Sequence, residues 1–197
     1  MQEVNMTSRK KNSASSLVWS PTDKGDVASV SLAGKRVTTS TAQGIRGTTG
    51  KSSGKWYFEF KIIQTESVGT VTTSPVIGIG TKQTSLYSPW ATGLQMLAWY
   101  CESSASNLIF GQSQPRPTYG TAFVVGSNVG VALDMSNRQL QFYRNNVPQG
   151  ILNLDTYTNG TEFYPYVCSP YGQGASVVDL FAGKDLVYPI PAGFQAW

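Results

Sequence analysis

The sequence predicts an all-β fold, which we expect to be a sandwich of two antiparallel sheets. Apolar residues recur at every second position in the longest patterned segments, as half-buried strands require. Gly, Asn, Asp and Pro divide these segments at short intervals, and none of the segments carries an apolar stripe at helical spacing. Many short strands with such turns between them are typical of a sandwich.

The clearest alternation lies in residues 55–62, 129–135 and 139–143. In the first of these, Phe58 and Phe60 face the predicted core, so Glu59 is expected on the outward face of its strand. The segment from Asp134 to Asn137 separates the other two and predicts a hairpin turn, because Asp and Asn side chains bond to the nearby backbone. Shorter strands are expected at Val76–Gly80, Leu94–Tyr100, Asn107–Phe110, Tyr164–Val167 and Ser176–Phe181.

The chain of 197 residues suits one domain preceded by a short arm. Residues 1–16 are polar and rich in Ser and Asn, which predicts a flexible arm, and the sandwich is expected over residues 17–197. The arm contains Arg9, Lys10 and Lys11, which could attach it to an acidic surface or to nucleic acid. A run of three charges is equally typical of a solvated tail, and both interpretations stay open.

Charge and hydropathy exclude several function classes. Charged residues make up 13% of the chain and its net charge is +4, of which the arm holds a large share. The remainder is close to neutral and offers no broad basic field, so nucleic acid is expected to contact the arm at most. No window approaches about 18 apolar residues, and no secretory signal is visible. We therefore expect that the protein is made in a cytosol and does not insert into a membrane.

The chain contains no histidine, which removes the commonest general base and the commonest metal ligand. A Ser-His-Asp triad is therefore impossible, and residues 50–54, which match a nucleophile-elbow pattern, are interpreted as a turn. Glu59 and Asp134 are the best carboxylate pair for a glycosidase, but a position on the outward face of a strand explains Glu59 better, and a position that opens a turn explains Asp134 better. We expect no enzymatic activity, no cofactor and no metal site.

Cys101 and Cys168 are the only cysteines of the sequence. Two are too few for a disulfide framework or for a structural zinc site. Buried free thiols are favoured over a single bridge, because free Cys is among the most buried residue types. The sequence leaves both states open.

Three segments, in matching order and spacing, resemble the core strands of the SPRY domain family. Residues 52–62 resemble its early Gly-Lys/His-aromatic-Tyr-x-Glu strand. Residues 129–146 resemble its Val-Gly-Val-x-Leu-Asp strand, tight turn and Leu-x-Phe-x-x-Asn strand, and Phe163-Tyr-Pro-Tyr-Val167 resembles its Tyr-Pro-x-Val strand. The resemblance implies a SPRY-type sandwich over nearly all of the chain outside the arm.

Two end segments resemble a narrower group, the SPRY proteins of bacteriophages and prophages. Residues 18–25 resemble its Trp-Asn-Pro-Ser-Asp-Lys opening, and residues 188–197 its Pro-Pro-Ala-Gly-Phe-Lys-Ala ending. The chain departs from the group at residues 180–182, where Leu-Phe-Ala replaces Asn-Phe-Gly. The resemblance implies a non-enzymatic virion protein of a tail fibre, a baseplate or a capsid decoration, attached through its arm. The alternatives are an intracellular adaptor that binds a peptide and a polysaccharide-degrading tail component.

In this family the partner docks on one rim of three loops, which here implies residues 42–49, 83–92 and 168–174. Tyr, Trp and Arg are enriched in binding hot spots, and aromatic rings also suit stacking on sugars. Other virion proteins, a host-surface protein or a glycan are the expected partners, with a homo-oligomer in the particle. Large aromatics packed under a long loop are the structural alternative. The candidate rim residues are Gln43, Arg46, Tyr87, Trp90, Tyr171 and Gly172.

Overall fold

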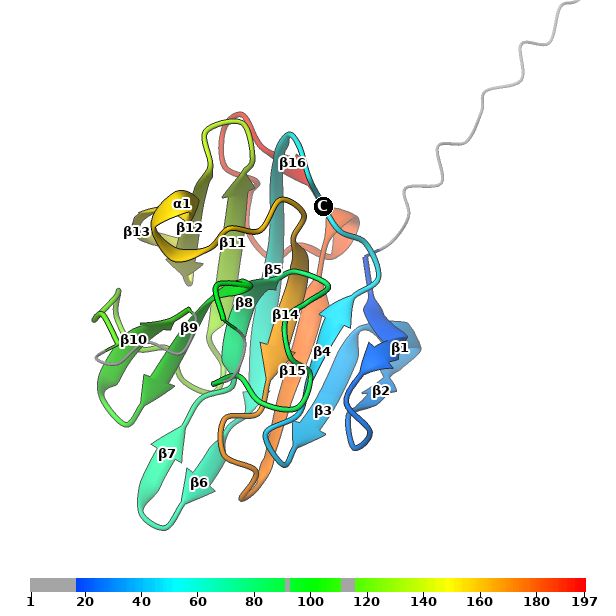
Figure 1. Cartoon of the computed structure of the whole chain (residues 1–197), viewed down its shortest axis with the longest axis vertical. Coiled ribbons are helices and arrows are strands. Elements are labelled where there is room, and N and C mark those ends of the chain that lie inside the picture. The colour runs from blue at the N-terminus through cyan, green and yellow to red at the C-terminus, as the bar shows by residue number, and fades with distance from the viewer. Residues whose placement is uncertain (1–16, 91–92, 111–115) are drawn as a thin grey trace, which may run out of the picture.

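The computed structural model describes residues 17–90, 93–110 and 116–197, and the predicted arm with Arg9, Lys10 and Lys11 lies outside them. The predicted all-β sandwich of two antiparallel sheets is confirmed (Figure 1). In the described part of the chain, helix is limited to α1 (Leu154–Tyr157) and the 3-10 turns η1 (Leu32–Gly34) and η2 (Gly183–Asp185). None of these is long and apolar enough to cross a membrane.

The first sheet has the strand order β1-β4-β14-β8-β9-β7-β6, with β10 paired to β9. Non-sequential neighbours such as β4 and β14 bring together loops that are far apart in the chain. The strands are β1 (Trp19–Lys24), β4 (Gly44–Gly47), β6 (Glu66–Val68), β7 (Val71–Thr73), β8 (Val76–Gly80), β9 (Met96–Glu102), β10 (Ala105–Ile109) and β14 (Tyr164–Cys168).

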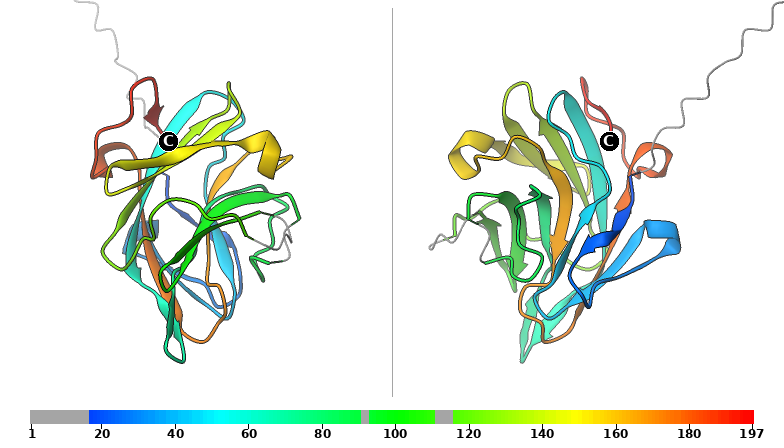
Figure 2. Two further views of the ribbon diagram at one scale, coloured as in Figure 1. Left: turned by 90° about the vertical axis from the view of Figure 1, so that its left-hand side faces the viewer. Right: turned by 45° about the vertical axis from the view of Figure 1, so that its right-hand side comes forward.

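The second sheet has the strand order β13-β12-β11-β5-β15-β3-β2 and forms the other layer of the sandwich (Figure 2). The short strand β16 runs parallel to β5 and lies beside it beyond the end of β15. The strands are β2 (Ser29–Ser31), β3 (Arg36–Ser40), β5 (Lys55–Gln64), β11 (Asn128–Asp134), β12 (Gln139–Arg144), β13 (Val147–Asn153), β15 (Ala175–Phe181) and β16 (Gln195–Ala196).

The main core lies between the two sheets, where inward-facing side chains of β5 meet those of the first sheet. Phe58, Phe60 and Ile62 are fully buried, as the alternation predicts. Trp19 of β1 stacks on Phe60 with ring centroids 5.9 Å apart, and Trp197 packs edge-on against Phe58 at 5.0 Å. Burying such a side chain contributes roughly 1.5–3 kcal/mol, so these rings fix the first strand and the last residue to the core.

A second, smaller apolar cluster lies on the outer face of the first sheet. Val76, Tyr100 and Tyr166 are fully buried there, and Leu86 and Trp90 of the β8–β9 loop pack against the cluster. The Tyr166 hydroxyl donates a 2.9 Å hydrogen bond to the backbone carbonyl of Ser85. The β8–β9 loop therefore covers this face of the sheet and does not stand away from it.

Glu59 lies on the outward face of its strand, as predicted, but it is fully buried there. The side chain does point away from the main core, but the segment that follows β15 covers it. The backbone N–H groups of Val187 and Tyr188 donate hydrogen bonds of 2.8 and 3.0 Å to its carboxylate, and the Tyr57 hydroxyl donates a third. A contact between residues 128 positions apart is invisible to a local alternation pattern.

The hairpin turn after β11 is confirmed, with the backbone N–H groups of Ser136 and Asn137 both donating to Asp134 Oδ1 at 3.0 Å. The segment at residues 50–54 leads into β5 without forming a helix, which agrees with its interpretation as a turn. Cys101 and Cys168 are both buried free thiols, which settles the state that the sequence left open. Burial raises the pKa of each thiol.

Candidate functional site

Three loops together form a rim: the β3–β4 turn, the β8–β9 loop and the β14–β15 loop. The first and the third lie at the bottom of Figure 1, and the β8–β9 loop crosses the outer face of the first sheet above them. The backbone N–H of Ser169 donates to the Gln43 carbonyl at 3.0 Å, and that of Gly44 donates to the Leu86 carbonyl at 2.9 Å. The first of the three predicted loops is shorter than expected, because half of residues 42–49 belongs to β4.

The rim carries a cluster of aromatic side chains formed by Trp90, Tyr100 and Tyr171. The Trp90 ring centroid lies 5.7 Å from that of Tyr171 and 5.7 Å from that of Tyr100. The guanidinium carbon of Arg116 lies 4.0 Å from the Trp90 ring centroid, a cation–π contact. The Trp90 indole N–H donates to the Pro170 carbonyl at 3.1 Å, so this cluster joins the second and third loops.

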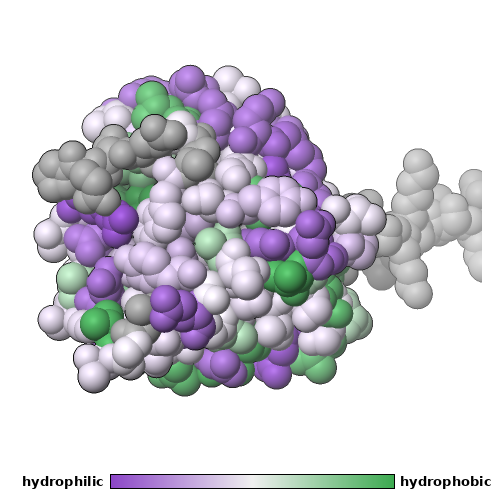
Figure 3. All heavy atoms as spheres, turned by 60° about the horizontal axis from the view of Figure 1, so that its bottom comes forward, coloured by the Kyte–Doolittle hydropathy of each residue, from purple (hydrophilic) through white to green (hydrophobic). Residues whose placement is uncertain are grey.

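The members of this aromatic cluster differ in how far they reach the solvent. Tyr100 is fully buried, and burial raises the pKa of its phenol well above the usual range. Trp90 is half-buried, whereas 40% of Tyr171 is exposed. Figure 3 shows that the face on which the rim lies is mostly of intermediate hydropathy, with only small strongly apolar patches. Tyr171 is thus the part of the cluster that a partner can reach first.

Gln43 and Tyr87 lie toward the turn between β1 and β2. The Tyr87 side chain is 57% exposed, and its hydroxyl lies 3.4 Å from Asp26 Oδ1. The Gln43 side chain is half-buried, and its Oε1 accepts a 2.9 Å hydrogen bond from the Val27 backbone N–H. Tyr87 is therefore free to contact a partner, while part of Gln43 serves to hold the turn.

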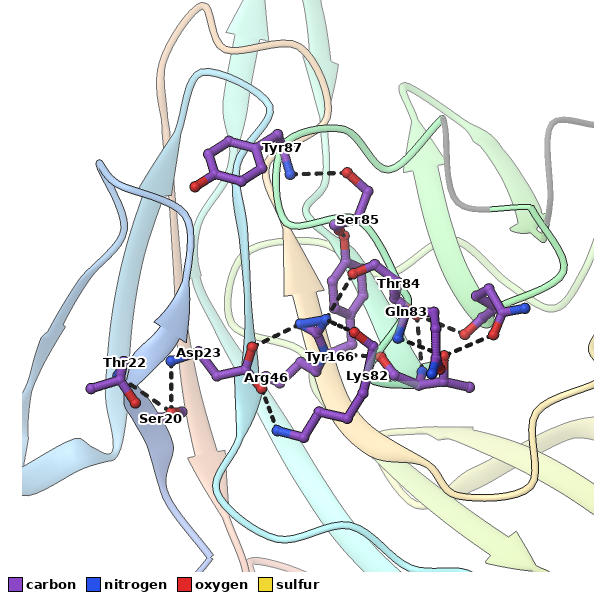
Figure 4. Close-up of polar contacts among 12 residues, drawn as sticks. Ser20, Thr22, Asp23, Arg46, Lys82, Gln83, Thr84, Ser85, Tyr87 and Tyr166 are labelled. Carbon is purple, nitrogen blue, oxygen red and sulfur yellow. Dashed lines mark hydrogen bonds and ion pairs between the residues drawn. The ribbon is translucent and has the colours of Figure 1, made fainter.

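Arg46 does not line the rim surface as expected, because it is 3% exposed and lies beneath the β8–β9 loop (Figure 4). Its Nη1 donates to Asp23 Oδ1 at 3.0 Å. Its Nε and Nη2 donate to three backbone carbonyls of the loop, at distances of 2.7–2.8 Å. Burial lowers the pKa of the guanidinium, and the nearby Asp23 opposes this shift. Arg46 thus supports the rim from below. The three carbonyls belong to Thr81, Lys82 and Thr84.

Glu66 of β6 anchors the third loop from behind, and the sequence reasoning missed it. It is 1% exposed, and the Gly172 backbone N–H donates to its carboxylate at 3.0 Å. The hydroxyl groups of Ser169 and Ser176 donate to the same carboxylate. A buried charge requires such donors to offset its lost hydration. A lone Glu in a polar stretch gives no sequence signal of burial.

Two open cavities flank the rim loops. One, of about 340 Å³, lies where the β8–β9 loop leaves the sheet, and polar residues such as Gln95 and Asn159 line it. The other, of about 210 Å³, lies beside Tyr171 and has a more apolar lining that includes Val71 and one carboxylate, Glu102. The Tyr171 hydroxyl donates to Glu102 Oε2 at 3.2 Å, so the second cavity adjoins the aromatic cluster directly.

The carboxylates considered for catalysis serve the structure. Asp134 accepts the turn N–H groups and the Lys55 ammonium at 2.8 Å, and Glu59 accepts three donors. Glu59 pairs with Gly130 of β11, four residues from Asp134, which places the two about 13 Å apart along the strand. A glycosidase requires about 5–9.5 Å between its carboxyl groups. The described residues contain no group of three His, Cys, Asp or Glu that could hold a metal ion.

Comparison with known proteins relates the chain to one domain family. The family model described as SPRY domain matches residues 55–181. The match begins at β5 and ends at β15, so it includes residues 55–62 of the first strand motif, the whole of the other two, and both the β8–β9 and β14–β15 loops. No curated protein matches the sequence.

Several solved structures share the fold at low sequence identity. The human HERC1 SPRY domain has a TM-score of 0.65 and 19% identity, with 87% of this chain and 99% of that chain covered. The TRIM65 PSpry domain has a TM-score of 0.64 and 14% identity, with 84% and 91% covered. Stonustoxin has a TM-score of 0.60 and 19% identity over 84% of this chain, but only 27% of its own length is covered. These identities establish similarity of fold alone.

Proposed function

The chain belongs to the SPRY domain family, and we propose that it is a non-catalytic module that binds a protein segment at the rim of its three loops. The observation that carries the proposal is the aromatic cluster, in which the exposed Tyr171 rests against Trp90. Family membership supports it, because SPRY domains generally bind protein partners. Aromatic side chains bury a large area and lose little conformational freedom on binding, so they are effective anchors.

The support beneath the loops favours the same function. Arg46 holds the second loop and Glu66 holds the third, each through several hydrogen bonds from a buried position. A loop that is already ordered loses less entropy when a partner binds, which increases affinity. Buried charged groups that stabilise loops far from the main core are consistent with a binding surface held in a fixed shape.

A peptide-display selection against the folded domain tests this proposal. We expect the selected peptides to bind the wild-type protein and to lose at least about tenfold in affinity to a Trp90→Ala, Tyr171→Ala double variant. Ile151→Ala is a matched control, because Ile151 is 63% exposed on β13 in the other sheet. Equal binding of the selected peptides to the double variant and to the wild type would show that the rim is not the binding site.

We further propose that the module is a component of a bacteriophage particle, where it displays the rim for a host-surface protein or glycan. The support is the resemblance of residues 18–25 and 188–197 to the ends of phage SPRY proteins. The arm with Arg9, Lys10 and Lys11 would attach it to other virion proteins or to packaged nucleic acid. Mass spectrometry of purified particles is the test: hundreds of copies would indicate capsid decoration, and tens or fewer a tail position. Absence from the particle would rule the virion role out.

An adaptor that binds one peptide inside the cell is the second candidate, and the cavity beside Tyr171 favours it. A single cavity of about 210 Å³ next to an aromatic cluster suits one side chain of one peptide. The virion role and the adaptor role predict different oligomeric states, which analytical ultracentrifugation of the full chain measures. A virion component is expected to form a symmetric oligomer, whereas an adaptor is expected to be a monomer.

A further inference from the structure

The cavity beside Tyr171 lies at the end of the outer face of the first sheet. Thr73 of β7 and Glu102 of β9 are directly paired across the two strands, so their side chains lie next to each other on the same face. Val71 lies two residues before Thr73 on that face, and Tyr171 approaches from the β14–β15 loop. The cavity therefore combines apolar walls with two adjacent polar groups. Its lining residues are Val71, Thr73, Glu102, Tyr171 and Gln173.

The hydroxyl of Thr73 has no hydrogen-bond partner, although the residue is fully buried. Buried polar groups in proteins are nearly always bonded, so an unpartnered hydroxyl on a residue that lines a cavity indicates a missing partner. The oxygen has an unused acceptor position, and because it is closed to water, a donor in the cavity reaches it only when the lining side chains shift. This feature is independent of the charge of the neighbouring carboxylate.

Glu102 supplies the negative charge of the cavity. Its Oε2 accepts hydrogen bonds from the hydroxyls of Tyr100 and Tyr171, at 3.0 and 3.2 Å. Within the described part of the chain, no ion pair compensates its charge. Two tyrosine hydroxyls hold the Glu102 carboxylate in place. A cation in the cavity would neutralise its charge through a charge-assisted hydrogen bond.

We propose that this cavity receives an arginine side chain of the bound protein segment, an inference that rests on the proposed function. The planar guanidinium presents several N–H donors, so it can bond to Glu102 and to the Thr73 hydroxyl at the same time. Its methylene groups pack against Val71 and the Tyr171 ring. An acidic or uncharged side chain would leave the carboxylate without its counter-charge.

The same rim already holds one guanidinium against an aromatic ring. Arg116 lies over Trp90 at 4.0 Å from the ring centroid and 5.8 Å from that of Tyr100. Guanidinium groups are more weakly hydrated than ammonium groups and stack on aromatic faces, which favours arginine over lysine beside Tyr171. Lysine would offer a compact point charge whose three donors rotate and have no fixed planar arrangement, so we expect it to bind more weakly.

Titration of the ¹⁵N-labelled protein with Nα-acetyl-arginine methylamide tests the proposal, with the acetyl-citrulline methylamide as the matched uncharged probe. We expect saturable shifts at the backbone amides of Thr73, Glu102 and Gln173, and about tenfold weaker binding of the citrulline probe. Glu102→Gln should remove most of this difference between the two probes. Thr73→Val should weaken arginine binding while the midpoint of thermal unfolding stays equal or rises, because no hydrogen bond is lost.

Equal affinity of the two probes for the wild-type protein would overturn the proposal, and so would unchanged arginine binding in Glu102→Gln. The comparison of the two probes on the wild-type protein holds even where a variant fails to fold. This outcome is separable from the proposed function. If the selected peptides depend on Trp90 and Tyr171 for binding but show no preference for arginine, the proposed binding function stands and only the arginine inference is contradicted.

Discussion

The backbone N–H of Gly172 donates a 3.0 Å hydrogen bond to the carboxylate of Glu66, a residue 106 positions earlier in the chain. Glu66 belongs to the short strand β6, whereas Gly172 follows the exposed Tyr171 in the β14–β15 loop. The bond crosses from one edge of the first sheet to the rim. It fixes the backbone directly next to the aromatic side chain that we propose as the main anchor for a partner.

Replacing Glu66 by Gln should destabilise the protein and loosen the third loop. The amide that replaces one carboxylate oxygen cannot accept from the N–H and hydroxyl donors that surround it. Hydrogen bonds to a charged group contribute about 1.5–3 kcal/mol, and we expect a loss of unfolding free energy in this range by urea denaturation. Glu162→Gln is the control, because Glu162 is exposed and accepts one hydrogen bond, from Tyr164. Equal losses in the two variants would contradict the anchoring role.

Replacing Gly172 by Ala should displace the same loop from the other side. The φ angle of Gly172 is +79°, and an added Cβ would lie 2.4 Å from Thr41 Cα. Gly126→Ala separates the two costs, since Gly126 has a φ of +87° but nothing within 4 Å of its added Cβ. We expect Gly126→Ala to lose about 1 kcal/mol of unfolding free energy from backbone strain alone. Gly172→Ala should lose clearly more unfolding free energy. Equal losses in the two variants would show that the loop moves away from Thr41 at no cost in stability.

The strands predicted from the sequence either alternate regularly between apolar and other residues or, like β8 and β14, are short segments that are buried on both faces. β5 and the β11–β12 hairpin carry regular alternation and a recognisable turn, and both were found as predicted. β13 was missed because it contains Pro148 and Gly150 and lies largely exposed at a sheet edge. Such a strand buries too little to leave an apolar pattern, and its position depends on β12 beside it.

The site was only partly predictable. The family resemblance implies that the rim loops lie close together, but it does not indicate which of their side chains are buried. The resemblance brought the second and third loops together, and Trp90 and Tyr171 are in contact. Arg46 was expected at the rim because it lies in the first of the three predicted loops and Arg is enriched in binding hot spots. Its burial depends on Asp23 and on carbonyls contributed by a loop about 36 residues away. No local pattern of sequence indicates such a partner set.

Asp134 should make the stability of the fold depend on acid pH. Burial would raise the pKa of its carboxyl, but the Lys55 ammonium at 2.8 Å and the donors of Asn137 outweigh burial, and the pKa lies below its usual 3.8. The charged carboxylate therefore stabilises the folded state at pH values above about 4. This stabilisation is lost as the pH falls through the lowered pKa of the folded state.

Asp134→Asn measures this dependence directly. Its unfolding free energy should lie below that of the wild type at pH 7, and the difference should shrink as the pH is lowered below about 4. Lys55→Met removes the cation from the other side and should reduce the acid sensitivity of the wild-type carboxyl. Urea denaturation at a series of pH values gives both results. A difference between wild type and Asp134→Asn that stays constant down to pH 2 would contradict the assignment.

Arg46 and Lys82 both pair with Asp23, and their comparison isolates the contribution of burial. Arg46 has a side chain 4% exposed and donates to three loop carbonyls as well, whereas the Lys82 side chain is 50% exposed. Arg46→Met should leave Asp23 with Lys82 as its partner, remove one donor from each of these carbonyls, and lower the unfolding free energy by about 3 kcal/mol. Lys82→Met should lower it by about 1 kcal/mol or less, because water and salt screen an exposed pair.

Amide hydrogen exchange distinguishes loss of the loop support from general destabilisation in Arg46→Met. Because Arg46 holds the β8–β9 loop onto the sheet, exchange at the backbone amides of Thr81 and Thr84 should accelerate more than exchange within β11. Peptides that bind the rim should also lose affinity for Arg46→Met, although Arg46 itself does not reach the surface. Uniform acceleration across the domain, with peptide binding unchanged, would mean that Arg46 stabilises the fold without shaping the rim.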